Sequence, residues 1–286
     1  MPAMPAMPAM PAMPAMPAMP AMPAMPATER LHSRLEAGVG TITLDHADKR
    51  NALGAAMVEG IVGALARFEA ARSRAVVLRA APGVRVWSAG HDVDELPESR
   101  RDPLGWDDPL RHLVRSIENF PAPVIAMVEG SVWGGATETV FACDLIVAAP
   151  DVSFAVTPAK LGVPYNVSGM LTFLNAGSIR VVKELAFTAR PMSATRAEQL
   201  GLINYVVPAD ALEGFTYELA RGIAELAPLS IAVMKEQLRI LSGAHPMTPQ
   251  GFERIQGLRR VVYDSDDYQE GIRAFKEKRR PLFRGE

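Results

Sequence analysis

The chain has 286 residues, a formal net charge of −2 and an isoelectric point of about 6.3, a balance that excludes the strongly basic domain typical of nucleic-acid-binding proteins. Cys143 is the only cysteine, which excludes an intrachain disulfide and favours a reducing, cytoplasmic location. The most apolar stretch, residues 124–136, contains Glu129 and is too short to cross a bilayer, so we expect neither a membrane nor a nucleic-acid partner.

The chain begins with a repeat: residues 1–27 are nine copies of Met-Pro-Ala. Proline at every third position favours extended chain without internal hydrogen bonds. We therefore expect residues 1–27 to be a disordered tail rather than a spacer or docking segment, and the fold to begin near Thr28.

The next part of the chain alternates predicted strands and helices. Gly40–Leu44 alternates apolar and polar residues, as a strand does, and apolar residues recur at helical spacing between residues 55 and 71. In chain order we predict a strand at 40–44, a turn at 46–51, a helix at 55–71, a strand at 75–78, a loop at 80–94, a helix at 111–120 and a strand at 124–128.

The predicted pattern stays mixed up to residue 207 and is helical after it. We predict a short helix at 134–142, strands at 145–147 and 152–156, helices at 179–188 and 193–201, a strand at 203–207, and then only helices, at 210–226, 229–241, 249–263 and 266–279. This order predicts an α/β core over residues 28–208 and a helical C-terminal region over residues 209–286.

Two loops rich in glycine stand out, Trp87–Leu96 (WSAGHDVDEL) and Val128–Glu138 (VEGSVWGGATE). Each follows a predicted buried strand and has glycine where backbone has to come close to another group. Gly135 is expected at a helix N-terminus, where free N–H groups and the helix dipole favour negative charge. The pattern indicates an anionic ligand or intermediate at this place.

Together the two loops resemble the signature loops of the crotonase superfamily, the enoyl-CoA hydratases and isomerases. The resemblance covers nearly all of residues 28–286, including Lys49–Leu53 and Ala274–Arg279. It implies a crotonase-like α/β fold with a spiral core of ββα units and a helical C-terminal region. It also implies that the backbone N–H groups of His91 and Gly135 form an oxyanion hole, the His91 imidazole being a possible bystander.

The sequence indicates the reaction less directly than it indicates the superfamily. Hydratases of this superfamily use two glutamates, and Glu138 matches the first. Pro158 matches the second and cannot titrate, which disfavours hydration because adding water needs both a base and an acid. An isomerase that moves one proton with Glu138 is less strongly disfavoured.

Decarboxylation needs fewer groups, because the substrate's own carboxylate leaves as carbon dioxide and an oxyanion hole stabilises the enolate. The segments 129–135, 161–166 and 252–260 resemble the methylmalonyl-CoA decarboxylases of the superfamily. This resemblance implies that the Tyr165 hydroxyl contacts the substrate carboxylate and that Thr157 is a second contact. Glu138 could assist protonation of the enolate or be a structural carboxylate, and both interpretations stay open.

The resemblance also implies where the coenzyme A part of the substrate binds. Backbone of the 89–93 loop would follow the pantetheine and adenine, a C-terminal Phe and Lys would complete the site, often from a neighbouring subunit, and a basic side chain would meet the phosphates. The residues concerned are Ala89, Gly90, Asp92, Val93, Phe275, Lys278 and Arg50.

No separate cofactor is expected, because coenzyme A is part of the substrate, and the histidines show no spacing typical of a metal site. Members of the superfamily are usually trimers or dimers of trimers, so we expect a homotrimer or homohexamer. A hypothesis of another class is a non-catalytic crotonase-like subunit that binds a partner such as RNA.

Overall fold

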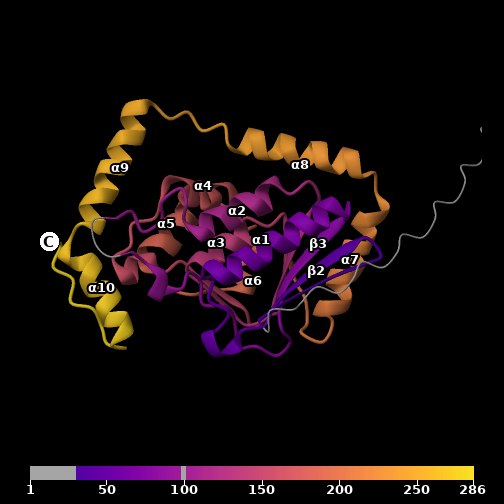
Figure 1. The fold of residues 1–286 in the computed structure, drawn as a ribbon, viewed down its shortest axis with the longest axis horizontal. Helices are drawn as coiled ribbons and strands as arrows, with labels where there is room; N and C mark the ends of the chain where they lie inside the picture. The colour runs from indigo at the N-terminus through magenta and orange to yellow at the C-terminus, as the bar shows by residue number, and fades with distance from the viewer. Residues whose placement is uncertain (1–29, 98–100) are drawn as a thin grey trace, which may run out of the picture.

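The structure is a computed structural model that describes residues 30–97 and 101–286 (Figure 1). The predicted tail at 1–27 lies outside the described residues. The main sheet has the strand order β1-β2-β3-β5-β7-β10. β1 and β2 form an antiparallel hairpin, and the other neighbours in the sheet are parallel. The strands span Leu31–Glu36 (β1), Val39–Leu44 (β2), Ala75–Ala80 (β3), Val124–Val128 (β5), Leu145–Ala148 (β7) and Tyr205–Val206 (β10).

A second, smaller sheet has the order β4-β6-β8-β9. Its strands are Val86–Ser88 (β4), Ser131–Trp133 (β6), Ser153–Ala155 (β8) and Met192–Ser193 (β9). β4, β6 and β8 each follow directly after a strand of the main sheet, namely β3, β5 and β7. The chain therefore passes repeatedly from the main sheet to the small sheet, which is the predicted spiral of ββα units.

α1 and α7 cover the main sheet, and the other core helices pack around the two sheets (Figure 1). α1 and α2 pack against each other, and α7 packs on β3 and β5. The buried face of α1 carries the apolar residues that the helical spacing predicted, such as Met57, Ile61, Leu65 and Phe68. The core helices are Ala55–Ala70 (α1), Pro109–Asn119 (α2), Gly135–Phe141 (α3), Val167–Ala176 (α4), Ile179–Thr188 (α5), Ala194–Gln199 (α6) and Leu212–Glu225 (α7).

The last three helices extend beyond this core, and Figure 1 shows them as an arm along one side and one end of the molecule. They are Pro228–Ser242 (α8), Pro249–Tyr263 (α9) and Asp266–Lys276 (α10). Lys235 fastens α8 to the core, because its Nζ lies 2.7 Å from the Asp144 carboxylate and donates to the carbonyl oxygens of Ile117 and Ala122. Large apolar side chains on α8 and α9 remain exposed, including Leu229, Leu238, Leu241, Leu258 and Val261.

Most predicted elements are confirmed within a few residues, and the differences have local causes. β1 was missed because only Leu31 of its six residues is buried, so no apolar alternation is visible. The predicted loop at 80–94 contains β4, and the second glycine-rich loop contains β6; three residues are too few for a period to appear. The helix predicted at 266–279 ends at Lys276, and the strand predicted at 203–207 is reduced to two residues.

α4 was also missed, although Asn166 caps it by accepting a 2.7 Å hydrogen bond from the Gly169 N–H. The proposed division into residues 28–208 and 209–286 stays a prediction. α7 belongs to the second part by sequence but covers the sheet of the first. No helix in the described part of the chain is long and apolar enough to cross a membrane.

Candidate active site

One cavity of about 890 Å³ brings together residues from the core and from the C-terminal arm. Its wall contains most of the residues that the sequence singled out: Arg50, Ala89, His91, Asp92, Val93, Gly135, Thr157, Tyr165, Phe275 and Lys278. Gly90 and Glu138 are buried behind the wall rather than part of it. The segments that form the cavity are far apart in sequence, so the fold itself assembles it.

The two glycine-rich loops meet at one end of this cavity. Gly90 has a positive φ of 87°, and a Cβ there would lie 2.9 Å from the Gly135 nitrogen and closer still to the Trp133 carbonyl oxygen. The two loops can therefore lie this close together only with glycine at position 90. The loop is held from behind, because the Leu53 N–H donates to the Gly90 carbonyl at 2.7 Å and the Ser88 hydroxyl accepts from the Gly90 N–H at 3.1 Å.

The amides of His91 and Gly135 lie next to each other as a result. A Cβ built at Gly135 would lie 3.5 Å from the His91 nitrogen. Gly135 is the first residue of α3, so its N–H has no partner within the helix. Gly134 before it adopts a φ of 55° and donates its N–H to the Ala155 carbonyl at 2.8 Å, which aligns the start of the helix with β8. This geometry can place two N–H donors around one anionic oxygen.

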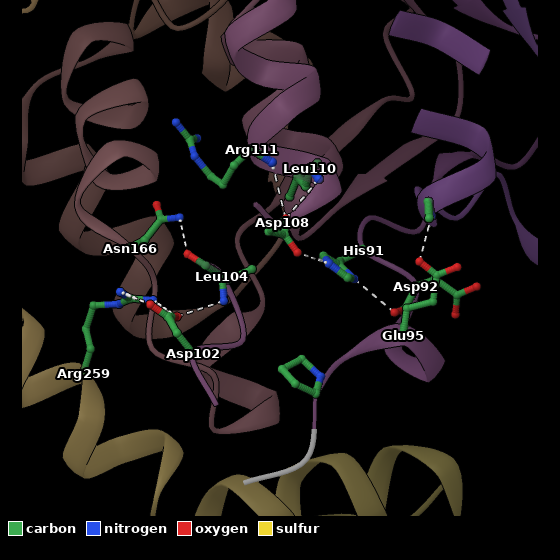
Figure 2. Close-up of polar contacts among 12 residues, drawn as sticks. His91, Asp92, Glu95, Asp102, Leu104, Asp108, Leu110, Arg111, Asn166 and Arg259 are labelled. Atoms are coloured by element: carbon green, nitrogen blue, oxygen red, sulfur yellow. Dashed lines mark hydrogen bonds and ion pairs between the residues drawn. The ribbon is translucent and has the colours of Figure 1, made fainter. Parts of the chain in front are cut away.

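The His91 ring is engaged at both nitrogens, as Figure 2 shows. Nε2 lies 2.7 Å from Oδ2 of Asp108, and Nδ1 lies 3.0 Å from the carbonyl oxygen of Asp92. Both side chains of the ion pair are about nine-tenths buried. Burial lowers the pKa of His91, but the hydrogen bond and the charge of Asp108 outweigh burial and raise it above its ordinary value. The ring is therefore part of a fixed ion pair.

Asp108 was not singled out from the sequence. Its Oδ1 caps α2 by accepting from the N–H groups of Leu110 and Arg111, at 3.0 and 3.3 Å (Figure 2). Asp followed by Pro at the first helical position is a recognised start signal, so the pair Asp108-Pro109 could have placed the helix start two residues earlier than predicted. The pairing of Asp108 with His91 has no sequence signal of its own.

Arg111 is a second residue that the sequence did not reveal. Its guanidinium pairs with Oε1 of Glu138, and the Tyr165 hydroxyl donates to the other carboxylate oxygen at 2.7 Å. Glu138 is 1% exposed, and burial raises the pKa of its carboxyl, against the opposing effects of Arg111 and the hydroxyl. Burial and the Glu138 charge raise the pKa of Tyr165 well above its usual value, so the phenol keeps its proton.

Pro158, which matches the second glutamate of the hydratases, is part of the wall and carries no carboxylate. Thr157 and Tyr165 also line the cavity, and Pro158 begins a short 3-10 helix, η3, that spans Pro158–Leu161. The acidic residues among the described residues of the wall are Asp48, Asp92 and Asp94, which come from the turn and the loop that precede α2. No group of three or more His, Cys, Asp or Glu among the described residues could hold a metal ion.

α10 and the residues that follow it complete the cavity from the same chain. Phe275, Lys278 and Arg279 line it together with Lys49 and Arg50. α10 packs against η3 so closely that a Cβ at Gly271 would collide with the Leu161 carbonyl. Tyr268 is fully buried and donates its hydroxyl to the Pro97 carbonyl at 2.7 Å. The predicted C-terminal Phe and Lys therefore reach the cavity without a second subunit.

Comparison with known proteins agrees with this geometry. The family model for enoyl-CoA hydratase/isomerase matches residues 34–286. The methylmalonyl-CoA decarboxylase of Escherichia coli K12 is 50% identical over 247 residues, which cover 86% of this chain and 95% of the relative. The mitochondrial enoyl-CoA hydratase domain-containing protein 2 of Bos taurus is 33% identical over 258 residues, 87% of this chain and 85% of the relative.

Solved structures give the same result. Methylmalonyl-CoA decarboxylase in complex with 2-nitronate-propionyl-CoA superposes with a TM-score of 0.89 at 48% identity, covering 91% of this chain and all of that one. The expected crotonase fold is thereby confirmed, with its two sheets and its helical C-terminal region. The chain belongs to the enoyl-CoA hydratase/isomerase family, the crotonase superfamily.

Proposed function

We propose that this protein is a carboxy-lyase that converts methylmalonyl-CoA to propionyl-CoA and carbon dioxide. The observation that carries this is the pair of convergent amides at the cavity, with Pro158 in its wall at the position where the hydratases have their second glutamate. The 50% identity to a methylmalonyl-CoA decarboxylase over most of both chains supports the same reaction.

In the proposed reaction the thioester oxygen lies between the N–H groups of His91 and Gly135. The bond between the α-carbon and the carboxylate breaks, carbon dioxide leaves, and the electron pair forms an enolate whose negative charge is on the thioester oxygen. A proton then adds to the α-carbon to give propionyl-CoA. The two amides contribute most in the transition state because the charge on the oxygen develops there.

Tyr165 and Thr157 are the proposed contacts of the substrate carboxylate. The Tyr165 hydroxyl has one proton to donate, and Glu138 already accepts it. The substrate carboxylate has to compete with Glu138 for that proton and is therefore held weakly, which suits a group that leaves. We assign Glu138 to the positioning of Tyr165, because both of its oxygens are engaged and it does not line the cavity.

The coenzyme A part of the substrate would extend toward α10. The proposed contacts there are the loop residues Ala89, Gly90, Asp92 and Val93 and the side chains of Arg50, Phe275 and Lys278. Lys49 holds the loop in place, because its Nζ lies 3.0 Å from the Asp92 carboxylate. The basic side chains of the wall, among them Arg50 and Lys278, suit the phosphates by charge.

Hydration or isomerisation of an enoyl-CoA is the second candidate. It would need Glu138 as a base, and Pro158 stands where a second acid would be needed. A purely non-catalytic subunit is the third, and the glycines that bring the two amides together argue against it. RNA binding that weakens steeply with salt would support that third candidate.

We also propose that the protein is a homotrimer or homohexamer. The exposed apolar side chains of α8 and α9, among them Leu229, Leu238, Leu241 and Val261, support this, since monomers rarely expose apolar patches of large size. Native mass spectrometry tests it: a mass three or six times that of the chain is expected, and a monomer would contradict it.

Product analysis by mass spectrometry tests the reaction itself. Purified protein is incubated with methylmalonyl-CoA and, in parallel, with crotonyl-CoA. Propionyl-CoA from the first and an unchanged second substrate are expected. A hydrated or isomerised product from crotonyl-CoA, with methylmalonyl-CoA unchanged, would refute the proposal.

A further inference from the structure

The His91 imidazole faces a hydrogen-bond acceptor at each of its two nitrogens. Nε2 is 2.7 Å from the Asp108 carboxylate, and Nδ1 is 3.0 Å from the Asp92 carbonyl oxygen. A neutral imidazole has only one N–H and can satisfy one acceptor. A carbonyl oxygen has no proton to offer, so the neutral ring would leave one of these buried contacts without a hydrogen.

Asp108 cannot supply the missing hydrogen either. Its Oδ1 accepts from the N–H groups of Leu110 and Arg111 at the start of α2, an 11-residue helix. The positive end of the helix dipole favours the ionised carboxylate there. Both oxygens of Asp108 are therefore acceptors. Only an imidazolium, which has an N–H at both ring nitrogens, donates a hydrogen bond to Asp108 and to the Asp92 carbonyl at the same time.

The other charged groups near His91 have partners of their own. The Asp92 carboxylate pairs with Lys49 at 3.0 Å, and Glu95 accepts a 2.7 Å hydrogen bond from the Ala55 N–H. The Arg111 guanidinium pairs with Glu138. Asp108 is thus the charge that faces the ring directly.

The ion pair has a direction. His91 lines the cavity, whereas Asp108 lies behind it and shares its charge with the helix start. The positive partner, His91, is therefore the one on the cavity side. Its backbone N–H is also one of the two convergent amides.

We propose that His91 is an imidazolium at neutral pH, held by Asp108 as a positioning residue, and that its positive charge favours formation of the enolate. This proposal rests on the proposed decarboxylation. The net charge of the reacting group is the same before and after the bond breaks, but the charge moves from the carboxylate at Tyr165 to the thioester oxygen at His91. A cation fixed at the second place stabilises the transition state more than the bound substrate, which is the condition for faster turnover.

Asp108→Asn tests the role, with Asp107→Asn as a matched control. Asparagine still caps a helix through its oxygen, so α2 is retained, but its NH₂ group faces Nε2 and favours the neutral ring. Asp107 is an exposed neighbour that does not line the cavity, so its variant removes the same formal charge.

For Asp108→Asn we expect kcat at pH 8 to fall roughly 10- to 100-fold, less than for loss of an oxyanion donor, with KM within about twofold of the wild type. Any recovery of activity should need a pH well below 6.5, because burial and the facing NH₂ group both lower the pKa of the ring in this variant. Asp107→Asn should match the wild type at every pH. Wild-type turnover in Asp108→Asn at pH 8, or an equal loss in Asp107→Asn, would overturn the proposal.

Nitrogen-15 NMR of the histidine rings gives a readout that needs no turnover. The full-length protein is labelled, and His91→Gln identifies the His91 signals among the five histidines. At pH 7 both His91 nitrogens should carry a proton in the wild type, and only one in Asp108→Asn. A neutral His91 ring in the wild type at pH 7 would overturn the proposal, even if methylmalonyl-CoA is decarboxylated. Failure of the proposed reaction alone would appear in the product analysis and leave this result unchanged.

Discussion

The hydroxyl of Tyr165 donates a 2.7 Å hydrogen bond to Oε2 of Glu138. The second oxygen of that carboxylate pairs with Arg111, so Glu138 has no oxygen directed at the cavity. The sequence left two interpretations of Glu138 open, a proton donor and a structural carboxylate. These contacts favour the second, in which a buried ion pair fixes the direction of the Tyr165 side chain.

Replacing Tyr165 with phenylalanine tests that side chain directly. We expect Tyr165→Phe to lower kcat about 10- to 100-fold, the range of one hydrogen bond to a charged group, while affinity for coenzyme A changes little. Steady-state kinetics and a binding titration with coenzyme A separate the two effects. Tyr205→Phe is the matched control, because this ring packs on Phe215 and does not line the cavity. Unchanged turnover in Tyr165→Phe would refute the orienting role.

Arg111→Met should destabilise the fold by about 3 to 5 kcal/mol, because it leaves the buried Glu138 carboxylate without its counter-charge. Urea unfolding followed by circular dichroism measures the difference. Arg180→Met, on the exposed surface of α5, should change stability by less than about 0.5 kcal/mol. Equal stability of the two variants would mean that the Glu138 pair is not a structural requirement.

Gly90→Ala should separate the two loops and reduce turnover roughly 100- to 1,000-fold, since an added Cβ collides with backbone at Trp133 and Gly135. Gly83→Ala provides the control for backbone strain alone. Gly83 has a similar positive φ of 77°, but a Cβ there meets no heavy atom within 4 Å. We expect Gly83→Ala to be fully active. Comparable activity of both variants would show that the close approach is not needed for catalysis.

Lys278→Glu should raise KM for the acyl-CoA roughly tenfold or more, because the change reverses a charge among the basic residues of the cavity wall. Its effect on kcat should be small, since the proposed contact of Lys278 is with the coenzyme A part and not with the reacting group. Lys276→Glu makes the same change on an exposed side chain that does not line the cavity, and KM should stay at the wild-type value. A KM shift of the same size in both variants would indicate a general charge effect.

The raised pKa of His91 has a consequence for stability. A histidine whose pKa is higher in the folded than in the unfolded protein adds stability below the ordinary value of 6.5, and this contribution is lost as the pH rises through the folded-state pKa. Urea unfolding at pH 6 and pH 9 should therefore show a decrease in the wild type that is smaller in Asp108→Asn. Asp107→Asn should follow the wild type. An identical pH dependence in all three proteins would contradict the raised pKa.

The sequence was informative where a local pattern carries the structure. The helical spacing of Met57, Ile61 and Leu65, the buried strands and the two glycine-rich loops were all recognisable, and the residues of those loops do meet at one cavity. The amino-acid sequence of the two loops also indicated the family. These features depend on residues that are close together in the chain.

The rest depends on contacts that only the folded chain creates. Arg111 lies 27 residues from Glu138, and Asp108 lies 17 residues from His91, so neither pairing leaves a periodic trace. The sequence suggested that the His91 ring could be a bystander, whereas the structure engages both of its nitrogens. The three-residue strands β4 and β6 were missed for a different reason, since a period cannot be recognised over so short a length.

The most direct test of the proposed decarboxylation is the reaction of methylmalonyl-CoA in deuterated water, with the products analysed by mass spectrometry. We predict carbon dioxide and propionyl-CoA that carries one deuterium at the α-carbon, because the enolate takes its proton after the carboxylate has left. Recovery of unchanged methylmalonyl-CoA, under conditions in which the protein hydrates or isomerises crotonyl-CoA, would contradict it.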